Sequence, residues 1–513
     1  MKVKRALISV FDKSGLEMFA KGLTDLGVQV ISTGGTARLL KDSGIPVTLV
    51  EEVTGFPEML DGRVKTMHPR LMAGILARRD VPEHMSTIAE HDIEPVDMVV
   101  CSLYPFEEVA GRRGVEDQVV IENIDIGGPS MIRAAAKNHA GVAVVTSNED
   151  YEPLLEELRA NDGELDYETL RGLAAKAFNR TAHYDFVIAN WFSEAEGDFP
   201  QHIMREYAKV TDVKYGENPH QRGAYYAEVG LRQHLLSQVE QLHGRQMSFN
   251  NLYDLNAARC ICEEFTLPCV TIIKHNNPCG CALAESLATA YDKAFACDPV
   301  SAFGSVIAVN RTVDVPTAER LSELFVEVLL APGYDAEALE ILTRKQDIRV
   351  LENRERRQAN PGELDAKRVL GGILVQDKDN DVEERDEMTV ATKKHPTEQE
   401  WGDLLFAFRI AKHVKSNAIV IARDLATLGV GAGQMSRVDS TRIAIDKARS
   451  DLKGAVVGSD AFFPFPDAVE MAIEAGVTAF MQPGGSKGDE AALEACDRLG
   501  AAMVFTGRRH FLH

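Results

Sequence analysis

The chain begins with an apolar run, Ala6-Leu-Ile-Ser-Val10, that is typical of a buried β-strand. Ser14-Gly-Leu-Glu17 follows with the spacing of a helix capping box, and apolar residues then recur at helical spacing as far as Gly27. A second apolar run, Val28-Gln-Val-Ile-Ser-Thr33, leads into a pair of glycines. The order strand, helix, strand predicts an α/β fold.

Further apolar runs at 96–101 and 142–146 extend this pattern over the first 150 residues. Strands that alternate with helices form a mostly parallel sheet with helices on both faces. We therefore predict a doubly wound parallel-sheet domain at the start of the chain. Ligands of such folds bind at the carboxyl ends of the strands, so the residues that follow each run are candidates for a site.

The composition limits the classes of function. The 513 residues include 56 basic and 78 acidic side chains, and this net charge of −22 argues against nonspecific binding to nucleic acids or anionic membranes. An apolar share of 45% excludes a disordered chain, and 8 cysteines are too few for a disulfide-stapled secreted protein. The first apolar run is too short for a signal peptide, and none reaches the ~20 residues of a membrane span. We expect a cytoplasmic protein.

A domain boundary is predicted in the acidic segment 193–200, which contains Gly and Pro and comes after a helical stretch. A second charged segment, 352–367, indicates a further division of the C-terminal part of the chain. The predicted domains are 1–195 and 200–513, the second with possible subdomains 200–360 and 366–513.

Two pairs of similar segments, called sequence echoes below, indicate an internal duplication of the second domain. The apolar runs at 270–274 and 418–422 each end in polar residues, and Ser301-Ala-Phe303 resembles Asp460-Ala-Phe462. Echoes of three residues are weak evidence for a repeat.

Candidate anion-binding loops follow the predicted strands of the first domain. Thr33-Gly-Gly-Thr36 stands between a strand and a helix, where backbone N–H groups can hold a phosphate. A tight turn with Thr36 as helix cap explains the same residues. Asp125-Ile-Gly-Gly-Pro-Ser130 is a second loop of this kind.

Charged and acid–base side chains accompany these loops. Arg63, Lys65 and His68 put three possible cationic groups into one short window, although a cluster of charges by itself favours a solvated loop over a binding site. Tyr104 follows a predicted strand, where a ligand would bind, and a tyrosine can act as a general acid–base when its surroundings shift its pKa.

The sharpest cluster of the second domain is Lys274-His-Asn-Asn-Pro278. A strand there delivers an ammonium, an imidazole and two amides into a turn, a set that a buried core does not need. An imidazole exchanges a proton near neutral pH, and an ammonium can stabilise an oxyanion. A surface turn with incidental charge is the alternative.

The neighbouring Cys279-Gly-Cys281 does not predict a zinc site. Structural zinc pairs are spaced C-x₂₋₄-C and need a second pair. Cys260 and Cys262 lie in a predicted helix and are better explained as small core residues.

Three further segments of the second domain suggest ligand contacts. Gly431-Ala-Gly433 could cradle an anion, with Arg437 closing the loop, although a plain β-turn is equally consistent. The aromatic and Pro-rich segment 460–467 favours a pocket wall over a regular element. The last residues, Arg508 to His513, are rich in basic and aromatic groups for a chain end.

These motifs, taken in order along nearly all 513 residues, resemble those of the AICAR transformylase/IMP cyclohydrolase family of purine biosynthesis. The resemblance implies that the first domain is a methylglyoxal-synthase-like cyclohydrolase. It implies that the second domain is a transformylase of two cytidine-deaminase-like units, without a metal, that uses 10-formyltetrahydrofolate as co-substrate. It also implies a homodimer with transformylase sites at the subunit interface.

For the transformylase, the resemblance implies that the amine of the ribotide AICAR attacks the formyl group of the folate. His275 would be the general base, Lys274 would stabilise the developing negative charge, and Asn417 would orient the reacting groups. The positions matched to the nucleotide and folate pockets are Lys214, Tyr215, Asn251, Gly304, Arg437, Phe462, Asp467, Ser486, Arg509 and His513.

For the cyclohydrolase, it implies that the carboxamide nitrogen of the formylated ribotide FAICAR attacks the formyl carbonyl, and that water leaves to give IMP. Lys137 matches the acid–base residue, with Tyr104, Lys65 and Asp125 beside it. The positions matched to nucleotide binding are Asp12, Lys13, Thr33, Gly34, Gly35, Thr36, Arg63, Val64, Thr66, Cys101, Ser102 and Ile126.

Two departures from the family pattern matter. Lys214 stands where the family has Arg, which keeps the charge but loses the bidentate fork, so we expect weaker nucleotide binding. Ser102 stands where Asn is also common.

Two alternatives stay open: the first domain could be a nucleotide sensor, or the whole chain a monofunctional cyclohydrolase with a scaffold domain. The acid–base set of the first domain argues against the sensor. The intact Lys274-His275 pair argues against the scaffold.

Overall fold

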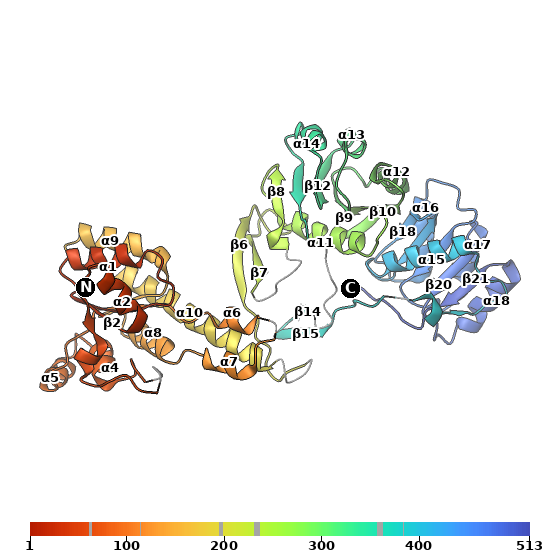
Figure 1. Cartoon of the computed structure of the whole chain (residues 1–513). Helices are drawn as coiled ribbons and strands as arrows, with labels where there is room; N and C mark the ends of the chain where they lie inside the picture. Colours follow the sequence, from red (N-terminus) through yellow and green to blue (C-terminus); the bar gives the residue numbers. More distant parts are fainter. Residues whose placement is uncertain (61–63, 113, 194–198, 230–235, 356–362, 383) are drawn as a thin grey trace. The chain divides into compact units, whose positions relative to one another are not determined.

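The computed structural model describes residues 1–513 apart from 61–63, 113, 194–198, 230–235, 356–362 and 383 (Figure 1). The chain divides into two compact units, Met1–Glu206 and Tyr207–His513, each with its own sheet. Within the described ranges, no helix combines the length and the apolar character needed to cross a membrane.

Unit 1 is built on a five-stranded sheet in the order β3-β2-β1-β4-β5, and all neighbouring strands run parallel. The strands are β1 (Arg5–Ser9), β2 (Gln29–Ser32), β3 (Thr48–Leu49), β4 (Met98–Cys101) and β5 (Ala143–Val145). The predicted parallel sheet is confirmed. Each apolar run of the sequence lies within about two residues of its strand, because these runs are buried on both faces.

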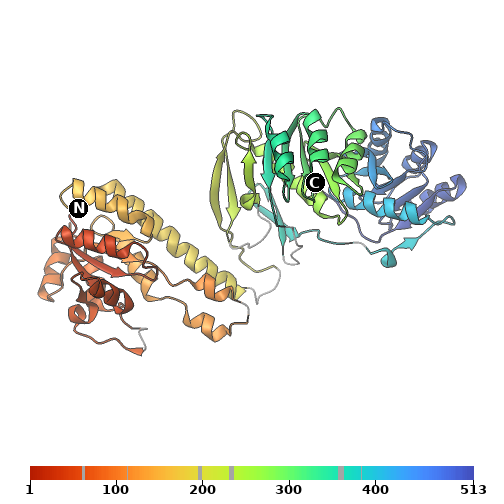
Figure 2. The same cartoon turned by 45° about the horizontal axis from the view of Figure 1, so that its top comes forward.

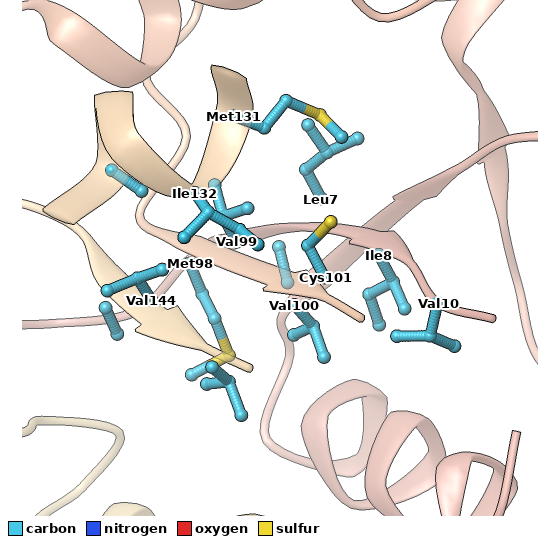
Figure 3. Close-up of a cluster of buried hydrophobic side chains, with 14 of the residues drawn as sticks. Leu7, Ile8, Val10, Met98, Val99, Val100, Cys101, Met131, Ile132 and Val144 are labelled. Carbon is cyan, nitrogen blue, oxygen red and sulfur yellow. The ribbon is translucent and has the colours of Figure 1, made fainter. Parts of the chain in front are cut away.

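Helices cover the sheet of unit 1. They are α1 (Leu16–Asp25), α2 (Gly34–Asp42), α3 (Val50–Thr54), α4 (Pro69–Leu76), α5 (Pro82–Glu90), α6 (Phe106–Ala110), α7 (Asp117–Glu122), α8 (Gly127–Lys137), α9 (Tyr151–Ala160) and α10 (Tyr167–Ser193), with the 3-10 turn η2 (Asn148–Asp150). Figure 3 shows Leu7 and Val99 on the side of Met131 from α8, whereas Ile8 and Val100 point to the opposite face. This alternation buries both faces of the strands.

Two local predictions for unit 1 are wrong. The N-cap of α1 is Gly15, which has a left-handed backbone and no side-chain cap, so Ser14 and Glu17 form no capping box. Helix α2 already begins at Gly34, one residue after Thr33, so Thr36 lies inside the helix and does not cap it.

Unit 2 contains one sheet of twelve strands in the order β16-β21-β20-β19-β17-β18-β10-β9-β11-β12-β13-β8. These strands are β8 (Glu240–His243), β9 (Cys269–Lys274), β10 (Asn277–Leu283), β11 (Ser305–Val309), β12 (Val326–Ala331), β13 (Arg349–Glu352), β16 (Thr389–Val390), β17 (Ile419–Arg423), β18 (Ala426–Gly431), β19 (Val456–Ser459), β20 (Ala479–Gln482) and β21 (Ala502–Phe505). Two separate hairpins pair β6 (Tyr207–Val213) with β7 (Gly223–Glu228), and β14 (Leu364–Val369) with β15 (Gly372–Asp377).

Helices lie on both faces of this sheet (Figure 2). One buried cluster joins α11 and α15 to residues from both halves of the sheet. On the other face, α12 to α14 pack on the first half, and α16 to α18 pack on the second. The helices are α11 (Phe249–Glu263), α12 (Leu287–Cys297), α13 (Val315–Glu323), α14 (Ala336–Thr343), α15 (Glu398–Ala411), α16 (Arg437–Lys447), α17 (Asp467–Glu474) and α18 (Asp489–Leu499), with the 3-10 turns η3 (Leu236–Gln238) and η4 (Arg385–Glu387).

Unit 2 is an internal duplication. The elements from α11 to β13 and those from α15 to β21 follow the same order, and the two copies meet where β10 pairs with β18. A Cβ at Gly280 would lie 2.0 Å from the carbonyl oxygen of Ala294, and a Cβ at Gly429 would lie 2.0 Å from that of Ala444. The same strand–helix contact therefore forbids a side chain in both copies.

Of the two echoes in the sequence, only one marks this repeat. The apolar runs at 270–274 and 418–422 correspond to β9 and β17, which occupy equivalent places. Ser301-Ala-Phe303 precedes β11, whereas Asp460-Ala-Phe462 follows β19. These two motifs lie at opposite ends of corresponding strands, so the resemblance between them is incidental.

Candidate active sites

The loops that follow β1 and β4 meet at the carboxyl edge of the unit 1 sheet. The hydroxyl of Ser102 accepts hydrogen bonds from the backbone N–H groups of Phe11 (2.7 Å) and Asp12 (3.3 Å). The ring of Tyr104 packs edge-on against that of Phe11, with centroids 5.7 Å apart, and remains half exposed. Asp12, Ser102 and Tyr104 are therefore brought together at the edge where ligands of this fold bind.

The start of α2 has the features of an anion site. Thr33 is the N-cap, and its hydroxyl is buried without a hydrogen-bond partner among the described residues. The hydroxyl of Thr36, in contrast, donates to the carbonyl of Val10 at 3.0 Å and has a structural role. A buried polar atom without a partner is costly, and a bound phosphate oxygen would satisfy the one on Thr33.

Lys65 and Thr66 reach two different helix starts. A Cβ at Gly34, whose φ is +54°, would lie 2.9 Å from Nζ of Lys65, so the ammonium stands directly beside the first residue of α2. Nζ of Lys65 also pairs with Glu58 at 2.5 Å. A Cβ at Gly127 would lie 2.9 Å from the hydroxyl of Thr66, beside the first residue of α8.

The other residues of this segment have different positions. Val64 pairs with Met59 through the backbone. Arg63 lies outside the described residues. Nζ of Lys13 donates to the carbonyl of Phe11 at 3.2 Å.

Asp125 is a candidate proton donor. Burial raises the pKa of its carboxyl group, and hydrogen bonds from backbone N–H groups oppose that shift only in part. Its Oδ1 accepts from the N–H of Gly128 at 2.9 Å. Its own N–H donates to the hydroxyl of Tyr184 at 2.7 Å, a contact from α10 that no sequence pattern indicates. A carboxyl group with a raised pKa keeps its proton to a higher pH than a free one does, which is the direction that a general acid needs.

Three other predicted residues of unit 1 surround α8. The thiol of Cys101 is buried and points to the carbonyl of Gly128 at 3.9 Å, and burial raises its pKa strongly. Ile126, the N-cap of α8, is exposed. Lys137 is the last residue of α8, about 15 Å along the helix axis from its start. The structure therefore does not bring the backbone of Lys137 to that of Asp125.

In unit 2, Lys274 to Asn277 form the hairpin turn between β9 and β10. Nζ of Lys274 donates to the carbonyls of Phe303 (3.0 Å) and Gly304 (2.7 Å). Lys274 and Gly304, both predicted as site residues, are therefore neighbours. His275 and Asn276 occupy the two central positions of the turn, both with positive φ.

Asn417 is held by an arginine that does not face solvent. The guanidinium of Arg437 donates to Oδ1 of Asn417 (2.8 Å), to Oδ1 of Asp460 (2.6 Å) and to the hydroxyl of Ser459 (2.8 Å). The side chains of Arg437 and Asp460 are 5% and 0% exposed. The interpretation of Arg437 as a residue that closes an anion loop over Gly431 is thus not supported by these contacts, because the buried Asp460 draws the guanidinium inward.

The chain end is tied to the same region. Nζ of Lys415 donates to the carbonyl of His513 at 2.8 Å, and the N–H of Ser416 donates to that of Leu512 at 2.9 Å. The N–H of Lys415 donates to Oδ1 of Asn277 at 3.1 Å. Lys415 therefore links the Lys274 turn to the terminus. Burial, followed by the nearby charge of Lys367, lowers the pKa of Lys415.

The remaining predicted residues of unit 2 are spread over three places. Lys214 stacks its ammonium over the ring of Tyr215 at 5.8 Å, and the loop that follows them contacts α11, where Asn250 bonds to the carbonyl of Glu217. The carboxamide of Asn251 is used in the capping box of α11. The others lie in the second half of unit 2 and at the end of the chain. Phe462 is half-buried, and Asp467 is the first residue of α17. Ser486 lies beside Asp489, and the guanidinium of Arg509 lies over the ring of Phe511.

The described residues include no group of three His, Cys, Asp or Glu side chains arranged to hold a metal ion. Cys279 and Cys281 lie in β10 with buried side chains, and Sγ of Cys281 lies 3.9 Å from Sγ of Cys269. Cys260 and Cys262 lie in α11, as predicted.

The comparisons with known proteins agree with this arrangement of two units. Residues 15–130 match the family model of the MGS-like domain, and residues 135–447 match that of the AICARFT/IMPCHase bienzyme. Three curated relatives are named bifunctional purine biosynthesis protein PurH. That of Thermoanaerobacter sp. is 49% identical, that of Magnetococcus marinus 50% and that of Bacillus subtilis 48%. Each alignment covers at least 99% of this chain and 100% of the relative.

The family model spans more than half of the chain, and the relatives match it from end to end. The chain therefore belongs to the AICARFT/IMPCHase bienzyme family, and it is a bifunctional enzyme of purine biosynthesis with formyltransferase and IMP cyclohydrolase activities.

Proposed function

We propose that unit 2 transfers the formyl group of 10-formyltetrahydrofolate to AICAR, and that unit 1 closes the ring of the product to give IMP. The main support for assigning formyl transfer to unit 2 is the Lys274 turn. It contains the ammonium of Lys274 and the imidazole of His275, and Lys415 connects it to the end of the chain. The carboxyl edge of the unit 1 sheet carries the candidate acid–base residues of the second reaction, namely Tyr104, Lys65 and Asp125.

In the transformylase, the amine of AICAR attacks the formyl carbon, a C–N bond forms, and the bond from that carbon to the folate nitrogen breaks. His275 accepts the amine proton, and the departing folate nitrogen gains one. Lys274 stabilises the oxyanion that forms on the formyl oxygen, because its ammonium is fixed by two backbone carbonyls and can still donate once more. Asn417, held by Arg437, orients the reacting groups.

In the cyclohydrolase, the carboxamide nitrogen of FAICAR attacks the formyl carbonyl, and the carbonyl oxygen leaves as water. The substrate phosphate binds at the start of α2, with the hydroxyl of Thr33 and the ammonium of Lys65 as partners. Asp125, whose carboxyl group has a raised pKa, and Tyr104 assist the proton transfers. The acid–base role of Lys137 rests on the sequence match alone.

A coupled assay tests the two activities and the role of Lys137. Purified protein receives AICAR and 10-formyltetrahydrofolate in the presence of a chelator, and release of tetrahydrofolate and formation of IMP are followed separately. Both products are expected without added metal. Lys137→Ala should still release tetrahydrofolate but should form no IMP above the uncatalysed rate. Normal IMP formation by this variant would remove Lys137 from the mechanism. No folate turnover by folded wild-type protein would overturn the assignment of unit 2.

Thr33→Val should weaken substrate binding without harming the fold. The hydroxyl of Thr33 is buried and unpaired within the described structure, so its loss should not lower the free energy of unfolding. A hydrogen bond to a phosphate is worth about 1.5–3 kcal/mol, so KM for FAICAR should rise roughly 10- to 150-fold. Steady-state cyclisation kinetics and urea unfolding measure the two effects.

Ser32→Ala is the matched control for Thr33→Val. The hydroxyl of Ser32 is equally buried but donates to the carbonyl of Ile8 at 2.7 Å. Its removal should cost about 1 kcal/mol of stability and leave KM unchanged. An unchanged KM in Thr33→Val would contradict the phosphate site.

We also propose that the enzyme is a cytoplasmic homodimer and that the duplicated halves of unit 2 are cytidine-deaminase-like. The dimer is supported by the β14–β15 hairpin, which exposes Leu370, Ile373 and Leu374. A two-stranded hairpin with exposed apolar side chains is marginal alone and is stabilised by a partner surface. The duplicated order of elements supports the second proposal.

Lys214 in place of the family's Arg is expected to bind the nucleotide less tightly.

A further inference from the structure

Both halves of unit 2 fix a hairpin turn in the same way, with a carboxylate from a helix. In the first half, Oδ1 of Asp254 on α11 accepts a hydrogen bond from the N–H of Asn276 at 2.7 Å, and the backbone of His275 bonds to the same carboxylate. In the second half, Asp403 on α15 accepts from the N–H groups of Asp424 (3.0 Å) and Leu425 (2.7 Å). The two carboxylates occupy equivalent positions in the repeat.

Each turn needs such a support because its two central residues are left-handed and neither is glycine. The φ angles are 52° and 62° at His275 and Asn276, and 53° and 55° at Asp424 and Leu425. Residues with a Cβ adopt this conformation at a cost, and it persists where surrounding contacts enforce it. The carboxylate supplies those contacts by binding the two N–H groups of the turn.

The two turns differ in the chemistry that they carry. The first presents Lys274 and His275, the candidate groups of formyl transfer, above the half-buried Asp254, and burial raises the pKa of the Asp254 carboxyl group. The second presents Asp424 and Leu425 beside a pocket of about 600 Å³, where Nζ of Lys293 donates to the carbonyl of Asp424. The carboxylate support is thus common to both halves, whereas the imidazole stands in the first turn alone.

We propose that Asp254 is a positioning residue for formyl transfer: it holds the backbone of the His275–Asn276 turn so that the imidazole of His275 and the ammonium of Lys274 face the substrate together. This inference rests on the proposed roles of Lys274 and His275. Asp254 need not touch the substrate. A misplacement of a catalytic group by about 1 Å costs on the order of 10²-fold in rate, so loosening the turn should act mainly on kcat.

The test compares Asp254→Asn with Asp403→Asn, which removes the same carboxylate charge from the equivalent turn. Formyl transfer kinetics, cyclisation of supplied FAICAR and thermal unfolding are measured on the full chain. Asp254→Asn should lower kcat of formyl transfer at least tenfold, keep KM for AICAR and for the folate within threefold, and leave cyclisation unchanged. Asp403→Asn should lower the melting temperature of unit 2 but keep kcat within twofold.

Two outcomes would overturn the inference. Unchanged kcat in Asp254→Asn would show that the turn does not depend on the carboxylate. An equal loss of kcat in Asp403→Asn would show that both carboxylates act only through the stability of unit 2.

Asp254→Glu keeps the test decisive if the Asn variant does not fold. It retains the charge but moves the carboxylate by one methylene, and it should lower kcat at least tenfold with KM unchanged. Wild-type kcat in this variant would count against a positioning role. The proposed function fails by a different result, namely full formyl transfer in a His275→Asn variant, so the two failures are distinguishable.

Discussion

His275→Asn is expected to lower the rate of formyl transfer by about 10²- to 10⁴-fold, the usual contribution of a general base. Asparagine is chosen because residue 275 has a φ of 52°, and Asn tolerates the left-handed region better than Ala does. The turn should therefore keep its shape, and the loss should report the imidazole alone. Single-turnover release of tetrahydrofolate measures the effect.

Ring closure provides the control for His275→Asn. The residues proposed for cyclisation lie in unit 1, whereas His275 lies in unit 2. The variant should convert supplied FAICAR to IMP at the wild-type rate. A parallel loss of both activities would mean that the two reactions do not use separate sites. Near-normal formyl transfer would remove His275 from the mechanism.

Arg437→Met is expected to destabilise unit 2 by about 3–5 kcal/mol, because it leaves the buried carboxylate of Asp460 without its charge partner. The same substitution frees Oδ1 of Asn417, so formyl transfer should also fall. Urea unfolding followed by tryptophan fluorescence measures the stability. In a Trp191→Phe background, Trp401 on α15 is the only tryptophan and reports on unit 2.

Arg442→Met is the control on the same helix. Arg442 pairs with Asp439 at 2.9 Å, but both side chains are about half exposed. Exposed pairs contribute roughly 0–1 kcal/mol, so this variant should unfold near the wild-type urea concentration. An equal effect of the two substitutions would mean that the Arg437–Asp460 pair is not an essential part of the core.

The sequence predicts the parallel sheet well because β1, β2, β4 and β5 are buried on both faces and read as continuous apolar runs. The start of α2 is predicted less well. Gly34 and Gly35 are typical of a turn, yet they form the first turn of the helix. The pair of glycines is compatible with both structures, because Gly34 has a φ of 54°, which glycine adopts without strain in a turn and equally at this helix start.

The candidate sites can also be predicted only in part from the sequence. Lys274 and His275 can be singled out because polar residues at the end of an apolar strand are conspicuous in a sequence. Asp254 cannot, because it is an ordinary acidic residue of a helix, and its importance lies in a hydrogen bond to a backbone group on another element. The inward orientation of Arg437 is hidden for a similar reason, since its buried partner Asp460 lies on a different segment.

The continuous sheet of unit 2 has a consequence for how this part of the chain unfolds. The two copies are joined where β10 pairs with β18, and one buried cluster runs beneath both through α11 and α15. Neither copy can lose its structure without exposing apolar surface and unpaired strand edges of the other. The duplication has therefore added a second copy to unit 2 without adding a second cooperative folding unit. Each copy depends on the other for its stability.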